Sequence, residues 1–134
     1  MSARVALDAS AAVRLLMGMD DDSRIADVLR EAAVVVAPML YVAEVANALR
    51  GYVDAGALDR DTAIERHEEA LHLVDDLVPD RELGLEALCE SIRNRHPAYD
   101  LVYAVLARRT GAGLLTRDGE LIALLPQLGV ESAL

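Results

Sequence analysis

The stretch Arg4-Val5-Ala6-Leu7-Asp8-Ala9-Ser10 decides the fold, because a short apolar run passes directly into an acid and then into a helical pattern. The run does not alternate apolar and polar residues, which indicates a strand buried on both faces. Similar runs recur along the chain at Val34-Val35-Val36-Ala37, Leu77-Val78-Pro79 and Leu114-Leu115-Thr116, and Gly129-Val130 is expected to begin a last strand. The pattern therefore predicts several short buried strands.

Helical patterns separate these strands. The clearest covers residues 40–53, where Val42, Val45, Leu49 and Val53 form an apolar stripe. Other helices are expected at about 11–17, 24–31 (capped within Asp20-Asp21-Asp22-Ser23), from Asp59 through Val74, at 81–94, 99–109 and 118–125. Strands that alternate with helices predict an α/β fold with a mostly parallel sheet covered on both faces.

Composition limits the class of protein. A chain of 134 residues with 54% apolar residues is expected to form a single domain, residues 1–134, with one core. It contains no apolar stretch of the roughly 18 residues that span a bilayer, and its start has no signal-peptide layout, so a cytoplasmic location is expected. Cys89 lies in a helical pattern with Leu88 and Ile92 and is expected to be structural.

The charge of the chain excludes several functions. The net charge of −10 argues against a broad basic face for nucleic acid, although a site built from carboxylates must itself be acidic. All 13 basic residues are Arg, and there is no Lys. P-loop nucleotide-binding proteins and phosphoryl-accepting receivers both rely on a Lys. A dehalogenase-like phosphatase needs a second Asp two residues after the first, where this chain has Ser10.

Acids and hydroxyls occupy the places where parallel sheets bind ligands, just beyond the carboxyl ends of strands. Asp8 and Ser10 follow the first strand, and Thr116 and Asp118 follow the fourth. Two further acids lie on helices: Glu44 is within the helix that follows the second strand, and Asp100 is just inside a helix start.

Crowded carboxylates repel one another unless a cation neutralises them, and their oxygens suit Mg²⁺ or Mn²⁺. Such an ion can activate water for attack on a phosphodiester. The four acids therefore suggest a metal-dependent phosphodiesterase.

Each candidate also has a structural interpretation. Asp8 could simply end its strand, and Asp118 could be an N-cap. Asp100 lies in the first turn of a helix, where the helix dipole favours an acid in any case. Periodicity alone places Glu44 on the solvated side of its helix. Ser10 and Thr116 could equally cap or turn the chain.

Other polar groups are weaker candidates. The acids at 20–22 are expected to be a solvated loop with a cap. His67 and His72 do not share a helix face as metal ligands would, and His96 beside Pro97 is expected to be a loop residue. The arginines of the last third of the chain could contact phosphates or could have structural roles at helix ends, and these are Arg93, Arg95, Arg108, Arg109 and Arg117.

Four sequence blocks together resemble the PIN domain, specifically the VapC type of toxin ribonuclease. They are Val5-Ala6-Leu7-Asp8-Ala9-Ser10, Val42-Ala43-Glu44-Val45-Ala46-Asn47-Ala48-Leu49, Tyr99-Asp100-Leu101-Val102-Tyr103-Ala104 and Leu114-Leu115-Thr116-Arg117-Asp118. One Asp-x-Ser is common, but all four blocks in this order across nearly the whole chain form a specific pattern.

The resemblance implies an α/β/α sandwich and an endoribonuclease that uses Mg²⁺ or Mn²⁺ and leaves 5′-phosphate and 3′-hydroxyl ends. It implies an RNA substrate, a homodimer and a small cognate antitoxin, as in a VapBC pair. An alternative is a PIN-like binding module with little nuclease activity. By position the metal-binding acids are Asp8, Glu44, Asp100 and Asp118, the supporting hydroxyls are Ser10 and Thr116, and Asn47 matches a frequent helix Asn.

Overall fold

The central element of the computed structural model is a parallel sheet. The structure describes residues 3–20 and 23–134, and within these ranges the sheet has four strands in the order β3-β2-β1-β4, all parallel. The strands are β1 (Arg4–Leu7), β2 (Val34–Pro38), β3 (Asp76–Val78) and β4 (Gly113–Leu115). The expected α/β class and parallel sheet are confirmed.

Strand β1 is central because two neighbours cover both of its edges. Val5 pairs with Val35 of β2 on one side and with Gly113 of β4 on the other. Ala6 and Leu7 are fully buried. A strand that is covered on both faces gains nothing from alternating polarity, which explains the continuous apolar run.

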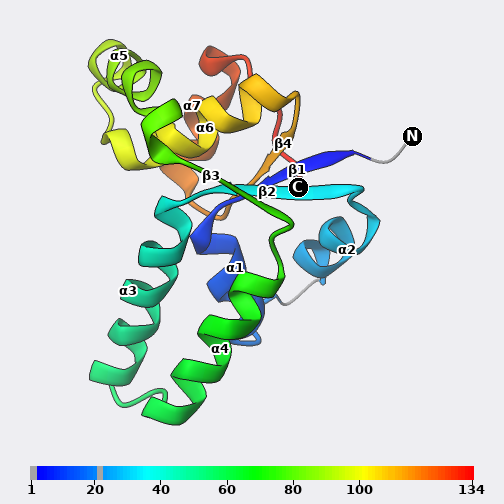
Figure 1. The fold of residues 1–134 in the computed structure, drawn as a ribbon, viewed down its shortest axis with the longest axis vertical. Coiled ribbons are helices and arrows are strands. Elements are labelled where there is room, and N and C mark those ends of the chain that lie inside the picture. The colour runs from blue at the N-terminus through cyan, green and yellow to red at the C-terminus, as the bar shows by residue number, and fades with distance from the viewer. Residues whose placement is uncertain (1–2, 21–22) are drawn as a thin grey trace.

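Helices lie on both sides of this sheet, as Figure 1 shows. The chain runs from β1 to β2 to β3 in one direction and then returns to the far side of β1. Because parallel crossovers are right-handed, this reversal moves the later helices to the opposite face. One layer holds α1 (Ala9–Leu16), α2 (Arg24–Glu31), α3 (Leu40–Asp54) and α4 (Arg60–His72), and the other holds α5 (Gly84–Asn94), α6 (Ala98–Thr110) and α7 (Gly119–Leu128).

Helix α6 forms the core of the second layer. Its residues 101–107 are all buried, and it contacts β1, β2 and β4 on one side and α5 and α7 on the other. A helix that is apolar around most of its circumference has to be enclosed in this way. No helix in the described ranges is both long enough and apolar enough to cross a bilayer.

All three helix starts that were expected to be capped are capped by side chains, and for α2 the cap comes from Asp20 of the stretch 20–23. Asp59 caps α4 by accepting from Thr62 N at 2.8 Å, and Asp118 caps α7. Ser23, in contrast, lies in the left-handed region at φ 58° and makes no side-chain cap for α2. Asp20 replaces it, because its carboxylate accepts from the first amides of that helix. The other two acids expected in this cap, at positions 21 and 22, lie outside the described residues.

Two expected elements differ in the structure. Residues 129–130 do not begin a strand, because Gly129 ends α7 at φ 69° and Val130 N donates to Leu125 O at 3.1 Å. Only an isolated parallel bridge between Leu114 and Ser132 follows. The helix expected at 81–94 is also shorter, because residues 80–82 form a 3-10 turn before α5 begins.

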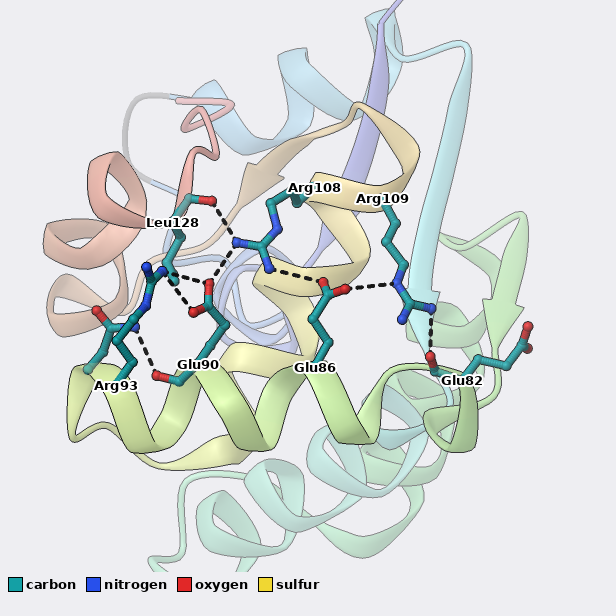
Figure 2. A network of polar contacts seen from close by, with 8 residues as sticks. Glu82, Glu86, Glu90, Arg93, Arg108, Arg109 and Leu128 are labelled. Carbon is teal, nitrogen blue, oxygen red and sulfur yellow. Dashed lines mark hydrogen bonds and ion pairs between the residues drawn. The ribbon is translucent and has the colours of Figure 1, made fainter.

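An ion-pair network holds α5 to α6 (Figure 2). Arg108 Nη1 lies 2.7 Å from Glu90 Oε2 and 3.1 Å from Leu128 O, and Arg108 Nη2 lies 3.0 Å from Glu86 Oε2. Arg108 keeps the pKa of Glu90 below its ordinary value of 4.5. Neighbouring pairs extend the network through Arg93 and Arg109. These three arginines therefore have structural roles.

The outer side of α5 is apolar. Leu85, Leu88 and Ile92 are 76%, 51% and 70% exposed, and Cys89 is exposed beside them. Cys89, which was expected to be structural and not catalytic, lies on this exposed side. An apolar stripe shows only that a helix has two different sides, and here the glutamates that bind Arg108 decide which side faces inward.

We expect Arg108→Met to lower the free energy of unfolding by about 2–3 kcal/mol, measured by urea denaturation at pH 7. The Glu90 side chain, only 10% exposed, would lose its main cation, and Leu128 O would lose a donor. The expected loss in the free energy of unfolding is smaller than for a fully buried ion pair, because Arg108 is 34% exposed. Arg50→Met is the control, since its pair with Asp54 is largely exposed, at 74% and 61%, and should contribute under about 0.5 kcal/mol.

The effect of Arg108→Met should also depend on pH. The folded-state pKa of Glu90 is lowered, so the stability from this pair is complete above the ordinary pKa of 4.5. It is lost as the pH falls through the lowered pKa. The difference between wild type and variant should therefore narrow in acid, and a constant difference would contradict this role for Glu90.

Candidate active site

The best-ordered part of the site is a hydrogen-bonded group at the carboxyl edge of the sheet. Leu7 of β1 pairs with Leu115 of β4, so the next residues, Asp8 and Thr116, emerge side by side. Thr116 Oγ1 donates to Asp8 Oδ2 at 2.6 Å, and Ser10 Oγ donates to the same oxygen at 2.8 Å. Three of the six candidate residues are therefore in direct contact.

The position of this group follows from the topology. The chain leaves β1 toward β2, whereas β4 arrives from the opposite helical layer, so the connections diverge between β1 and β4. This reversal is the switch point at which open parallel sheets bind their ligands.

Asp118 is tied to the group through its backbone. Its amide donates to Thr116 Oγ1 at 3.1 Å, while the neighbouring amide of Arg117 donates to Ser10 Oγ at 3.1 Å. The Asp118 side chain also acts as the N-cap of α7, because Oδ1 accepts from the amides of Glu120 and Leu121. The structural role considered for Asp118 is therefore present, but it occupies only one of the two oxygens.

Asp100 enters from the first turn of α6 and is held by a histidine. His96 Nε2 lies 2.6 Å from Asp100 Oδ2, and the His96 side chain is only 9% exposed. His96 does lie in a loop, as expected, but the sequence interpretation missed its contact. The spacing of four residues between His96 and Asp100, adjoining a helix start, is the signal that could have found it.

Glu44 lies on α3 and is half-buried, so the expectation of a solvated side chain from periodicity alone is wrong. Burial raises its pKa, and the charges of Asp8 and Asp100 raise it further. The nearby Tyr103 side chain is fully buried, and the Glu44 carboxylate raises the pKa of its phenol in addition to burial.

The carboxylates influence one another electrostatically. Burial raises the pKa of Asp8, hydrogen bonds from Thr116 and Ser10 oppose the increase, and the charge of Asp100 adds to it. Burial likewise raises the pKa of Asp100, His96 opposes this, and Asp118 adds to it. All four candidate acids are thus electrostatic neighbours, although they come from separate segments of the chain.

The oxygen atoms of these side chains are suitable ligands for a hard divalent cation. Carboxylate oxygens with hydroxyl support are what Mg²⁺ and Mn²⁺ prefer. The buried Tyr103 hydroxyl makes no hydrogen bond of good geometry among the described residues, yet it lies close enough to the Glu44 carboxylate to lower the pKa of that acid against the effect of burial. In the described ranges no three His, Cys, Asp or Glu side chains yet meet closely enough to hold an ion. The acids would have to draw together around it.

The remaining polar groups have structural partners. His67 Nε2 lies 3.3 Å from Val42 O, which links α4 to α3. Arg117 Nη2 lies 3.7 Å from Asp20 Oδ1, and the Asp20 side chain is only 5% exposed. The expectation of a solvated loop is therefore wrong for Asp20, because that carboxylate is buried by its capping role.

We expect Asp8→Asn to raise the melting temperature of the metal-free protein at pH 7 by about 3–5 °C, the shift that roughly 1 kcal/mol gives a chain of this length. The raised folded-state pKa means that ionised Asp8 costs stability above its ordinary pKa of 3.8. The Asn carbonyl oxygen could still accept from both Ser10 and Thr116.

The gain should be largest at neutral pH and should shrink as the pH falls through the raised folded-state pKa, until Asp8 is protonated in both states below its ordinary pKa of 3.8. Scanning calorimetry in EDTA measures the difference in melting temperature between Asp8→Asn and wild type. Asp118→Asn is the control, because Asn caps a helix as well as Asp, and its melting temperature should change little. A lower melting temperature for Asp8→Asn would show that the charge of Asp8 does not destabilise the metal-free protein.

The comparisons with known proteins agree with this fold. A search of curated proteins finds no match. The solved structure of PAE2754 from Pyrobaculum aerophilum is similar, with 26% identity and a TM-score of 0.69, over 95% of this chain and 90% of that one. The family model of the PIN domain matches residues 5–124, which include all six candidate residues. PIN domains are generally metal-dependent nucleases, and this chain belongs to the PIN domain family.

Proposed function

We propose that this protein is a metal-dependent endoribonuclease, the toxin of a VapBC-type pair. The observation that carries the proposal is the hydrogen-bonded group of Asp8, Ser10 and Thr116 at the switch point of the sheet, where the charge of Asp100 acts on Asp8, that of Asp8 on Glu44, and that of Asp118 on Asp100. Buried carboxylates that raise one another's pKa cost stability, and such groups cluster at functional sites.

The residues proposed to hold the ion are Asp8, Glu44, Asp100 and Asp118. Bound Mg²⁺ or Mn²⁺ would supply positive charge for the phosphoryl oxygens and lower the pKa of water.

The three aspartates share a feature that supports this assignment. Each uses one oxygen for a structural hydrogen bond, namely Oδ2 of Asp8 and of Asp100 and Oδ1 of Asp118. Within residues 3–20 and 23–134, the side-chain and capping hydrogen bonds of each aspartate fall on that one oxygen, although the Ser10 amide also acts on the Asp8 carboxylate. Their carboxylates are thus oriented by the protein while one oxygen remains available to a ligand.

An exposed aromatic side chain beside the acids favours a single-stranded RNA substrate. Tyr99 precedes Asp100, is 65% exposed, and borders a cavity of about 330 Å³ that Glu44 and Asn47 also line. Unpaired bases stack on such rings. The net charge of −10 disfavours broad contact with the phosphate backbone, so we expect a locally recognised loop or end. The larger apolar groove between α3 and α4, about 490 Å³, includes none of the six candidate residues.

We further propose that residues 1–134 act as one domain in the cytoplasm, as a homodimer that a small antitoxin inhibits. The homodimer and the antitoxin rest on the resemblance to VapC, and the single domain and the location rest on the composition of the chain. A short overlapping reading frame upstream that encodes a DNA-binding-like protein would support the antitoxin. A solitary gene would favour the alternative, a PIN-like binding module with little nuclease activity.

We expect the purified protein to cut single-stranded RNA with Mg²⁺ or Mn²⁺, to lose cleavage in EDTA, and to regain it when either ion is added back. Asp8→Asn should lower the cleavage rate at least about 100-fold, because it removes a charge from the centre of the site. Gel analysis of labelled RNA measures both effects. Equal cleavage by wild type and Asp8→Asn, or full activity in EDTA, would refute the proposal, and RNA binding without cleavage would favour the binding module.

We expect His96→Ala to raise the Mn²⁺ concentration needed for half-maximal cleavage by about 10–100-fold, because Asp100 would lose the group that orients it. A metal titration of the cleavage rate separates this effect from a loss of folded protein. His72→Ala is the matched control on the exposed side of α4 and should leave the titration unchanged. A lower maximal rate with an unchanged midpoint would contradict the orienting role.

A further inference from the structure

The four proposed metal-binding acids differ in how they are held. Hydroxyl groups donate to the carboxylate of Asp8, a histidine contacts that of Asp100, and backbone amides donate to that of Asp118. Within residues 3–20 and 23–134, no donor of good geometry binds the carboxylate of Glu44, and the donor that acts on it is the Tyr103 hydroxyl. A side chain with several rotatable bonds does not keep one orientation without such a partner. Glu44 therefore lacks the support that the other three acids have.

The hydroxyl of Tyr103 has the opposite deficiency. The Tyr103 side chain is fully buried on α6, and in the described part of the chain its hydroxyl makes no hydrogen bond of good geometry. Tyr103 follows Asp100 by three residues, so the two side chains share one face of the helix. Helix α6 packs against β1 and β2, the strands that lead into Asp8 and into α3, and this brings the phenol beside the Ala9 amide and the Glu44 carboxylate. A buried hydroxyl without an acceptor is unfavourable and rare in folded proteins.

We propose that Tyr103 is a positioning residue whose hydroxyl donates to the Glu44 carboxylate and holds it toward the bound ion. A hydrogen bond from a hydroxyl to an ionised carboxylate is short and strong. In the described ranges the acids do not yet meet closely enough to hold an ion. Movement of Glu44 inward would complete the site and satisfy the buried hydroxyl at the same time, so ion binding and this hydrogen bond should strengthen each other. The inference rests on the metal site of the proposed function and adds to it a residue that is not itself a ligand.

A second buried tyrosine provides a matched control. Tyr41 of α3 is also fully buried, but its hydroxyl donates to Ala70 O of α4 at 2.7 Å and so has a structural role. Replacement of either tyrosine by phenylalanine removes a hydroxyl and keeps the ring that fills the core. The two variants therefore separate an effect of the hydroxyl on the acids from an effect on the stability of the fold.

Calorimetric titration of the RNA-free protein with Mn²⁺ tests the proposal. Tyr103→Phe should raise the dissociation constant of Mn²⁺ about 10-fold, because Glu44 loses the group that orients it. Its melting temperature in EDTA should not fall, since the hydroxyl has no well-formed hydrogen bond to lose in the described part of the chain. Tyr41→Phe should bind Mn²⁺ like wild type but melt about 3–5 °C lower, because Ala70 O would lose a donor. An unchanged Mn²⁺ affinity in Tyr103→Phe would overturn the inference and leave the metal site intact.

A Glu44→Ala background shows whether Tyr103 acts through Glu44. In that background Tyr103→Phe should not weaken Mn²⁺ binding further, because the carboxylate that the hydroxyl positions is absent. An equal loss of affinity in both backgrounds would show that the hydroxyl acts on another group, which would also overturn the inference.

The absorbance of the protein gives a readout that is independent of nuclease activity. The chain contains four Tyr and neither Trp nor Phe, so near-UV difference spectra report on its tyrosines. Saturating Mg²⁺ should shift the tyrosine band to longer wavelength, because a phenol that donates a hydrogen bond absorbs there. The shift should remain in Tyr41→Phe and disappear in Tyr103→Phe, and a shift that persists in Tyr103→Phe would contradict the proposal. Wild-type protein that binds neither ion would refute the metal site of the proposed function, and the inference with it.

Discussion

The carboxylate of Asp8 is removed from water at the end of the central strand, and two hydroxyl donors offset part of the cost. The other features of the site follow from this constraint. Thr116 has to stand beside Asp8, which fixes the pairing of β1 with β4. The turn after β4 has to return its amides to Ser10 and Thr116, which places Asp118 at the start of α7. The sheet order and the site are therefore two aspects of one arrangement.

Much of the fold could be predicted from the sequence, because its strands are short apolar runs and its helices begin at recognisable caps. The bounds of α2 agree with the sequence, and Asp59 caps α4 as expected. The errors occurred where local pattern does not determine structure. Gly129 permits either a turn or a helix end, and only the packing of α7 selects the second. The stretch 20–23 caps α2 as expected, but the pattern could not say which residue acts, and it is Asp20 and not Ser23.

The sequence located the site residues that follow strands, but it placed those on or near helices less well. Asp8 and Thr116 follow strands, where the topology rule applies directly. Glu44 could not be placed by periodicity, because the side of α3 that faces the other acids is not its apolar side. His96 was overlooked because its loop position conceals a side-chain contact with Asp100. The orientation of α5 was missed for a similar reason, since ion pairs with Arg108 outweigh an apolar stripe.

The dual use of Asp118 has a consequence for the motions of the chain. One oxygen of this carboxylate anchors the first turn of α7, and the other is left for a ligand. Occupancy of the site and fraying of that helix are therefore thermodynamically linked, because both act on one side chain. Anything bound at the carboxyl edge of the sheet would thus slow hydrogen exchange in the first turn of α7, and a partner that unwinds this turn would in return weaken the binding.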